Sequence, residues 1–270
     1  MKRTLALAGL TLAVCALACA QDDTGNRVVI PARNGSRPRT VEASVISGSI
    51  TVKTGSGTDI IAEIPGARPR RESRAPQGMH RIDVPWRDAI QAEESGDIVR
   101  IALGPGSSGE DLALTVPANT SLKVRSTHGD VKVTGVHGEI DAASVHGDIV
   151  LTDVSGTVLA NTVHGNITAG MNQVDQTKPI SFSTLSGNID VTLPADVKMT
   201  LKLKADRGDI WSDFDVRLAG GGTGGMTQLS GRPPGRGRLL TDRSLQGTIN
   251  GGGVQATFYT VNGRITIHKK

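Results

Sequence analysis

The sequence contains very few aromatic residues: three Phe, two Trp and one Tyr among 270 residues. So few rings cannot fill a thick globular core, so the chain is expected to bury Val, Ile, Leu and Ala in a thin one. The same shortage argues against binding of single-stranded nucleic acid, because such sites stack bases on aromatic side chains. No stretch shows a convincing helical period, which favours an all-β fold.

Cysteine is almost absent as well, and both copies lie near the N-terminus, at Cys15 and Cys19. The chain begins Met-Lys-Arg, continues through a short apolar stretch and reaches Ala-Cys-Ala before a polar segment. This pattern predicts a secretory signal peptide over residues 1–20, cleaved after Ala20. The exported chain would then contain no disulfide, and we expect it to be periplasmic, associated with the cell envelope or extracellular.

Cys19 offers an alternative route, because lipoprotein signals are cleaved immediately before a cysteine that then carries lipid. The preceding Ala16-Leu17-Ala18 matches such a signal imperfectly, since leucine usually stands three positions before the cysteine. We therefore favour a free exported chain and keep a lipid anchor on Cys19 as the alternative. No later stretch reaches the roughly 18 apolar residues of a membrane helix, so we expect no transmembrane segment in the mature chain.

A strong net charge and catalytic motifs are also missing. Lys2 and Arg3 lie in the predicted signal, which leaves 28 basic against 26 acidic residues in the exported chain. There is no G-x-S-x-G elbow, no Walker loop and no cysteine after the predicted cleavage site. Gly251–Gly253 is interpreted as a turn, because no helix follows it to point its N-terminus at a phosphate. We expect no enzyme activity, no cofactor and no nucleic-acid partner.

A nine-residue repeat is the main feature that the sequence does contain. Residues 129–164 divide into GDVKVTGVH, GEIDAASVH, GDIVLTDVS and GTVLANTVH. The third position of each unit is β-branched, and the eighth is always valine. Such self-similarity is typical of a repeat architecture, in which each unit buries its apolar face against the next. The glycines that begin these units, and the unit after them, are predicted turns: Gly129, Gly138, Gly147, Gly156 and Gly165.

Two repeats are needed to close one coil, since nine residues make only one strand and one turn. Similar glycine turns return after spacings of 22, 21, 39 and 16 residues, which correspond to about one, one, two and one further coils. These predicted turns lie at Gly187, Gly208, Gly247 and Gly263. The sequence therefore predicts an all-β fold: a β-solenoid, or a β-helix-like stack of short strands, with a nine-residue half-coil and a coil of about 18–22 residues.

We predict three regions along the chain. The signal peptide occupies residues 1–20, a flexible N-terminal segment occupies 21–38, and a single β-strand-repeat domain occupies 39–270. Two stretches without apolar periodicity, at 65–81 and 219–238, are predicted to be loop insertions in that domain.

Three parts of the sequence carry a family resemblance: "EDLALTVPANTSLKVRSTHGDVKV" from Glu110, the repeated Ser/His-Gly-polar-Ile turns, and the closing "SLQGTINGGGVQATFYTVNGRITIHKK". Together they resemble a bacterial family of exported β-strand-repeat proteins with a domain of unknown function (DUF4097-like), labelled "putative adhesin". The resemblance covers roughly residues 40–270 and implies a fold and an exported location, with no catalytic residue to carry over. The chain departs from the family in having His where Ser is commoner before the turn glycine, and an Arg-rich insertion after Pro65.

Three histidines fall at equivalent positions of successive 18-residue coils: His128, His146 and His164. Stacked imidazoles could hold zinc or copper, with Asp130 and Asp148 as further ligands. Ser155, Ser186 and Arg207 stand before the turn glycine in other coils, however, which indicates a structural position rather than a ligand set. We therefore predict no metal site and keep these histidines as the metal candidates.

Carboxylates follow several turn glycines, at Asp130, Glu139, Asp148 and Asp209. Acids on one rim of a β-helix could act as an acid–base pair on a polysaccharide. The equivalent positions become Thr157, Asn166 and Asn188 in other units, which favours a polar rim. An Arg-rich stretch from Arg68 to Arg74 could bind anionic lipid or glycan, although charge runs are usually solvated loops.

These observations favour an exported, non-enzymatic binding or structural protein whose flat solenoid faces recognise another protein or a surface glycan. Two alternatives remain at this stage. One is a carbohydrate-active β-helix enzyme that uses the rim carboxylates, and the other is a lipid-tethered envelope-stress component that depends on Cys19.

Overall fold

The computed structural model describes residues 20–21, 26–32, 38–66, 89–104, 107, 109–218 and 244–270. Cys19, with the rest of the predicted signal peptide before Ala20, lies outside the described residues. So do residues 67–81 and 219–238 of the predicted loop insertions, together with the whole Arg-rich stretch. Within the described ranges there is no helix with the length and apolarity that crossing a membrane would take.

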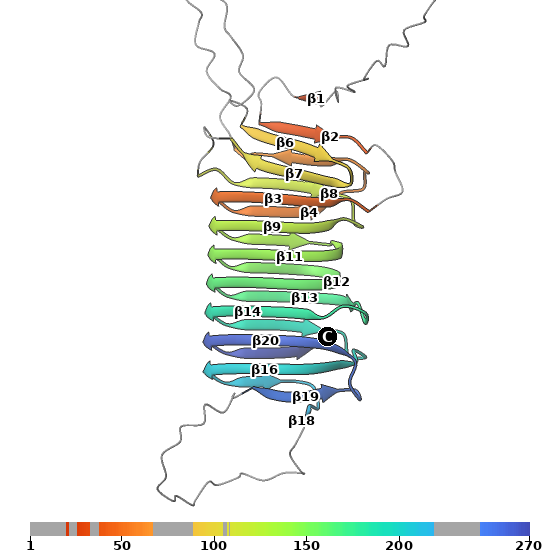
Figure 1. Cartoon of the computed structure of the whole chain (residues 1–270), viewed down its shortest axis with the longest axis vertical. Coiled ribbons are helices and arrows are strands. Elements are labelled where there is room, and N and C mark those ends of the chain that lie inside the picture. Colours follow the sequence, from red (N-terminus) through yellow and green to blue (C-terminus); the bar gives the residue numbers. More distant parts are fainter. Residues whose placement is uncertain are drawn as a thin grey trace, which may run out of the picture.

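The described residues form a rod of stacked short strands (Figure 1), which confirms the predicted all-β solenoid. Its coils have two long faces, which we call the β9 face and the β10 face after a strand in each. The β9 face contains, in stacking order, β7 (Ile98–Leu103), β3 (Thr40–Ser47), β9 (Ser121–His128), β11 (His137–His146), the second half of β12 (Ile149–His164), β14 (Ile180–Ser186), β20 (Val254–Asn262) and β16 (Met199–Arg207). The β10 face contains β8 (Leu112–Val116), β4 (Ile50–Thr54), β10 (Val131–Thr134), the first half of β12, β13 (Ile167–Val174), β15 (Ile189–Leu193), β21 (Ile265–Lys269) and β17 (Ile210–Ser212).

The nonapeptides set the register of the central coils. Ile140 in β11 pairs with Leu122 in β9 on one side and with Val158 in β12 on the other, so each partner is 18 residues away. Each of these coils has nine residues on each face, because the buried Ile140 of β11 follows the buried Val131 of β10 by nine residues. The next coil lengthens to 22 residues, with Ile167 of β13 paired to Ile189 of β15.

Apolar ladders run along the rod between the two faces. On the β10 face, Val131, Ile149, Ile167 and Ile189 lie in register, and each is fully buried. On the β9 face, another buried ladder contains Ala142, Ala160, Phe182 and Phe258 in register. The rings of Phe182 and Phe258 are stacked, with centroids 5.3 Å apart. Aliphatic residues fill most of the rest of the core.

The order of the coils differs from the order of the chain at both ends. The C-terminal pair β20 and β21 lies between β14–β15 and β16–β17, so its colour is out of sequence in Figure 1. The early pair β3 and β4 likewise lies between β7–β8 and β9–β10. The expectation that the glycine spacings mark successive coils is therefore wrong after residue 193. The segments β3–β4 and β20–β21 are instead inserted between the last coil at each end and the rest of the stack.

Antiparallel strands close the ends of the parallel stack. At one end β6 (Ile90–Ser95) pairs with β7, and β5 (Ile60–Glu63) pairs with β8 and β2 (Arg27–Ile30), which also pairs with β1 (Ala20–Gln21). At the other end β19 (Leu245–Ile249) pairs with β16 and β18 (Arg217–Leu218). Parallel edge strands would otherwise present unpaired backbone groups to other chains.

Two sequence predictions are corrected at these ends. The segment 21–38 is not flexible throughout, because β2 pairs with β5 and buries Val28 and Ile30 in the core. Four residues before a proline are too short a pattern to reveal this strand from the sequence. Gly247 is not a turn between coils either: it lies inside β19, and a Cβ there would come within 2.5 Å of the Val216 side chain.

The turn around Gly251–Gly253 explains how the C-terminal coil reaches its place. It leads from β19 on the outer side of β16 to β20 on the inner side. Asn250 adopts a φ of 51° and donates from its amide nitrogen to the carbonyls of Ala195 and Val197, in the connection before β16. The predicted turn is thus the point at which the chain passes around the end of a strand.

Candidate binding face

Glycines form a column along one edge of the solenoid, which we call the glycine column. A Cβ placed on Gly147 would lie 2.2 Å from the carbonyl oxygen of Gly129, and one on Gly165 would lie 2.1 Å from that of Gly147. Since neither Gly147 nor Gly165 has a left-handed φ, the close approach of the next coil is what requires glycine there. In stacking order the column contains Gly48, Gly129, Gly147, Gly165, Gly187, Gly263 and Gly208.

Gly138 and Gly156 correct the turn prediction for the other edge. They lie inside the continuous strands β11 and β12, so the second half-coil begins there without a separate turn. A Cβ on Gly156 would lie 2.4 Å from the carbonyl oxygen of Gly138, so these two glycines also permit close stacking.

Buried hydroxyl groups satisfy the carbonyls of the glycine column. Each hydroxyl lies two residues before the position occupied by His128 and its equivalents, and donates to the glycine carbonyl of a neighbouring coil. The donor–acceptor pairs are Ser126 to Gly48 (3.2 Å), Ser144 to Gly129 (3.1 Å), Thr162 to Gly147 (3.1 Å), Thr184 to Gly165 (3.0 Å) and Thr260 to Gly187 (3.0 Å). Without these donors the buried carbonyl oxygens would lose a hydrogen-bond partner.

The residues that follow the glycines cap the backbone of the next coil. Asp130 Oδ1 accepts a hydrogen bond from the backbone N–H of Asp148 at 3.0 Å, and Asp148 Oδ1 accepts one from Asn166 at 2.7 Å. The side-chain oxygens of Asn166 and Asn188 continue the series at 2.9 Å. An amide oxygen does this as well as a carboxylate oxygen, which explains why both Asp and Asn occur at this position.

The four predicted rim acids therefore do not form one set. Asp130 and Asp148 cap the backbone beside the glycine column. Glu139 instead lies in β11 and forms an ion pair with Lys178, with 2.7 Å between Oε2 and Nζ. Asp209 stands before β17, in the last coil of the stack. The arrangement supports a capping role for the acids that the repeat places after glycine.

The three histidines stack as regularly as the glycines. The rings of His128 and His146, and those of His146 and His164, have centroids 5.0 Å apart and planes inclined by 2°. Imidazole lone pairs lie in the ring plane, so stacked parallel rings direct them along parallel lines. One zinc ion needs nitrogen lone pairs that converge on a single point at about 2.0–2.1 Å, and rings stacked in parallel do not direct them so. No cluster of three or more His, Cys, Asp or Glu side chains suited to a metal occurs in the described ranges.

We expect replacement of His128, His146 and His164 by serine to leave the fold intact. Ser47 and Ser186 occupy the same column in neighbouring coils, so serine is already compatible with the backbone there. Urea unfolding should show a change of about 1 kcal/mol or less. A loss of several kcal/mol would show that the imidazole stack is a main stabilising element, and heat on titrating the unchanged protein with zinc would support the metal alternative.

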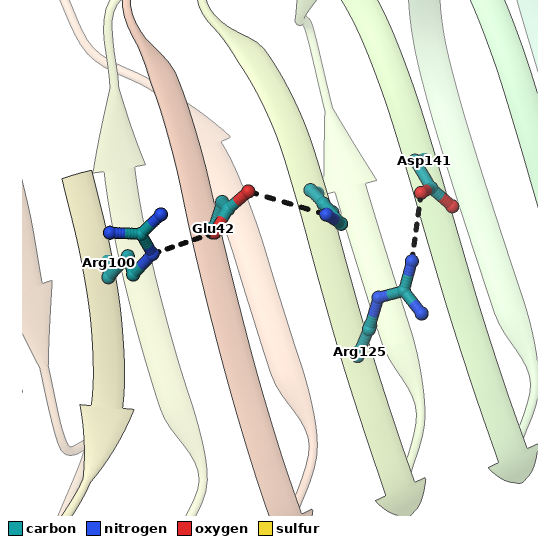
Figure 2. Close-up of polar contacts among 5 residues, drawn as sticks. Glu42, Arg100, Arg125 and Asp141 are labelled. Atoms are coloured by element: carbon teal, nitrogen blue, oxygen red, sulfur yellow. Dashed lines mark hydrogen bonds and ion pairs between the residues drawn. The ribbon is translucent and has the colours of Figure 1, made fainter. Parts of the chain in front are cut away.

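Charged side chains form a second ladder on the outside of the β9 face, near the β7 end (Figure 2). Glu42 in β3 lies between two cations: Arg100 Nε of β7 is 3.1 Å from its Oε2, and Lys123 Nζ of β9 is 3.4 Å from its Oε1. Arg125, two residues further along β9, places Nη2 3.1 Å from Oδ2 of Asp141 in β11. Neighbouring strands thus present charges of alternating sign across four coils.

The environment of Glu42 favours its ionised form. Partial desolvation acts to raise the pKa of its carboxyl, but the hydrogen bonds and charges of Lys123 and Arg100 outweigh this and lower the pKa below its ordinary value. All members of the ladder remain solvent-accessible, and exposed ion pairs contribute little to folding stability. The ladder is therefore a surface feature that stays charged at neutral pH and is available to a partner.

A shallow groove of about 430 Å³ follows this ladder, and we call it the charged trough. Its floor is low because Ala102 and Ser44 lie beside the longer side chains of the ladder. The lining residues are Glu42, Ala43, Ser44, Gln91, Glu93, Arg100, Ile101, Ala102, Lys123 and Arg125. A second hollow shares Ser44 and Arg125 and continues over Ile46 and Val145, whose exposed fractions are 76% and 37%.

The charged trough is not recognisable in the sequence. Glu42 is 58 residues from Arg100 and 81 residues from Lys123 in the chain, and the intercalation of β3 brings them together. The only local signal is the alternation of charged and buried residues in "TVEASV" and "SLKVRS", which is common to any exposed strand.

Two solved structures resemble the chain. A "putative cell adhesion protein" from Clostridium sporogenes is 10% identical, with coverage of 90% of this chain and 99% of that one, at a TM-score of 0.45. A "putative adhesin" from Bacteroides fragilis is 9% identical, with coverage of 90% and 97%, at a TM-score of 0.35. Likenesses this distant carry no argument about function. No curated protein matches the chain.

The family is shown by the sequence itself. The sequence profile described as Toastrack DUF4097 matches residues 28–227, which begin in β2 and include the repeats, every member of the glycine column except Gly263, and the charged trough. This match confirms the resemblance seen in the repeated turns. The chain belongs to the Toastrack DUF4097 family.

Proposed function

We propose that the protein is an exported, non-enzymatic, adhesin-like binding protein, and that its charged trough contacts a protein partner in the cell envelope. The observation that carries the proposal is the trough itself: fixed charges of both signs on rigid strands, adjoining exposed apolar side chains. Arginine and accessible apolar residues together are characteristic of protein–protein interfaces. Because the strands are held in register by neighbouring coils, little conformational entropy is lost when a partner binds.

The chemistry of the trough also favours a protein over an acidic polymer. Glu42 and Asp141 alternate with the three cations, so a uniformly anionic chain would meet carboxylates as well as bases. A protein surface can present complementary charges of both signs together with an apolar contact for Ile46 and Val145. A carbohydrate-active enzyme would need acids on the rim, but Asp130 and Asp148 accept hydrogen bonds from backbone N–H groups instead.

The proposal includes export. Residues 1–20 direct secretion and are removed, and the β-strand-repeat domain then acts in the periplasm, at the envelope or outside the cell. If processing occurs before Cys19 instead, the same domain acts from a lipid anchor. In either case the charged trough is open to a partner on the outside of the β9 face.

Charge reversal at Arg125 tests the proposal. We expect Arg125→Glu to reduce retention of the purified protein on isolated bacterial envelopes by about tenfold or more, because it places like charges beside Asp141 and opposes the partner's acidic groups. Treating the envelopes with protease should remove the retention of the wild-type protein, and raising the salt concentration should weaken it.

Lys53→Glu is the matched control, since Lys53 is an exposed cation in β4, on the β10 face. It changes the net charge equally and should leave retention unchanged. Equal losses for both variants would attribute the effect to net charge alone. Unchanged retention of Arg125→Glu, in a variant with a normal unfolding curve, would contradict the role of the charged trough.

A further inference from the structure

The last strand of the β10 face carries a tryptophan on its outside. Trp211 in β17 is 60% exposed, although large aromatic side chains are normally well buried. It pairs across the sheet with Thr266 of β21, which in turn pairs with Asp190 of β15. The indole therefore lies at the end of an outward row that continues into polar side chains.

A histidine between two carboxylates lies beside this row. His268 Nδ1 is 3.0 Å from Asp213 Oδ2, and its Nε2 is 3.6 Å from Asp190 Oδ2. Asp213 also accepts a hydrogen bond from the backbone N–H of Lys269 at 3.4 Å. One carboxylate lies at each end of the imidazole, and the hydrogen bond to Asp213 orients the ring while all three groups remain accessible to solvent.

The hydrogen bond between His268 and Asp213 favours the charged form of both groups. The hydrogen bond to Asp213 is the main cause that raises the pKa of His268 above its ordinary value, with burial acting in the opposite sense. The hydrogen bond from His268 likewise lowers the pKa of Asp213. The stabilisation from His268 is lost as pH rises through its raised pKa, and that from Asp213 is lost as pH falls through its lowered pKa. The paired form is therefore favoured at pH 6, which lies below the ordinary pKa of histidine and above that of aspartate.

We propose that this patch, which we call the Trp211 patch, binds a pyranose ring of a neutral polysaccharide. Trp211 supplies a flat apolar surface for the C–H face of the sugar, while Asp190 and Thr266 offer an acceptor and a hydroxyl to its hydroxyl groups. Adjacent strands are about 4.8 Å apart and alternate residues about 6.6 Å. The two-by-three grid of Trp211, Thr266, Asp190, Asp213, His268 and Thr192 thus has the footprint of one or two sugar rings.

The charges of the patch indicate which sugars fit. Two carboxylates against one imidazole would repel an acidic sugar such as a uronate, whereas neutral hydroxyls can donate to the free lone pairs of Asp190 and Asp213. The Trp211 patch lies on the opposite face from the charged trough, so it does not rest on the function proposed for the trough. It adds a glycan contact to a protein contact on one rigid rod.

Retention on insoluble neutral polysaccharides tests this inference. The purified full-length exported protein is mixed at pH 6 with cellulose, chitin and, for comparison, an acidic polyuronate gel. We expect retention on at least one neutral polymer and none on the polyuronate. Trp211→Ala and Asp190→Ala should each lower the apparent affinity by about tenfold or more, and Trp211→Tyr should restore much of it because it restores a ring.

Leu218→Ala is the control, because Leu218 in β18 is another large apolar side chain, 50% exposed, at the same end of the rod. It should bind as the wild type does. Failure of the wild-type protein to bind either neutral polymer would overturn the inference, as would unchanged affinity in Trp211→Ala. Binding that soluble choline displaces and soluble oligosaccharides do not would also overturn it, because that result would identify a cation site. None of these outcomes depends on the trough variants.

Discussion

Gly147→Ala is expected to destabilise the protein by about 3–5 kcal/mol, which is a large effect for the addition of one methyl group. The new Cβ would lie 2.2 Å from the carbonyl oxygen of Gly129, and this atom belongs to backbone that is hydrogen-bonded on both sides. Relief would require the two coils to separate locally, which would also lengthen the Ser144 hydrogen bond to the same oxygen. Urea unfolding followed by circular dichroism measures the loss.

Gly170→Ala separates this contact from the general effect of replacing glycine. Gly170 lies in β13, has no left-handed φ, and a Cβ there would meet its nearest neighbours at 3.9 Å. Its replacement should change stability by about 1 kcal/mol or less and in the favourable direction, since alanine has fewer unfolded conformations to lose. If Gly147→Ala unfolds at the same urea concentration as Gly170→Ala, the glycine column does not hold the coils at the distance described.

Ile149→Asp is expected to prevent stable folding, with a loss of more than about 4–5 kcal/mol. Ile149 is fully buried in the ladder between Val131 and Ile167, where the thin core has no water or counter-charge to offer a carboxylate. Neighbouring coils should be affected as well, because each coil buries its apolar face against the next. Circular dichroism and limited proteolysis of the purified variant provide the measurement.

Thr152→Asp is the paired control, since Thr152 lies three residues further along β12 and faces solvent. It introduces the same charge into the same strand and should fold normally. A wild-type melting curve for Ile149→Asp would refute a core of inward-facing ladders and with it the solenoid account of the repeats.

The central coils could be predicted because their neighbours in space are their neighbours in sequence. Between residues 122 and 164 each strand pairs with the strand 18 residues away, so the nine-residue period contains both the fold and its register. The stacked positions of His128, His146 and His164 follow from the same period. The period alone does not reveal the hydrogen bonds beside these histidines, because the hydroxyl and carboxylate groups bond to backbone atoms of a neighbouring coil.

The ends of the rod could not be predicted in this way. A Gly-x-Ile turn looks the same whether the next coil comes from the adjacent sequence or from the C-terminus, so nothing in the spacing at Gly187 reveals that Gly263 stacks on it. The charged trough and the Trp211 patch both lie in these intercalated regions. Their residues come together only through pairings such as Glu42 with Arg100 and Trp211 with Thr266, which are long-range in the chain.

The capping role of Asp130 could not be inferred from the repeat, although the repeat gives its position. A carboxylate after glycine in three of five units suggested either a rim of acids or a polar edge. Asp130 and Asn166 each accept a hydrogen bond from the backbone N–H at the equivalent position of the next coil, so a side-chain oxygen is the shared requirement and charge is incidental. The repeat therefore conveys a rule of backbone satisfaction more than a rule of chemistry.

The measurement that tests the central claim most directly is sedimentation of the purified exported protein with bacterial envelope and polysaccharide fractions, while the supernatant is assayed for new reducing ends. The claim of a non-enzymatic binding protein predicts retention in the pellet with no rise in reducing ends over time. New reducing ends that increase with protein concentration would contradict it by showing an enzyme, and a protein that stays in the supernatant with every fraction would contradict the binding role.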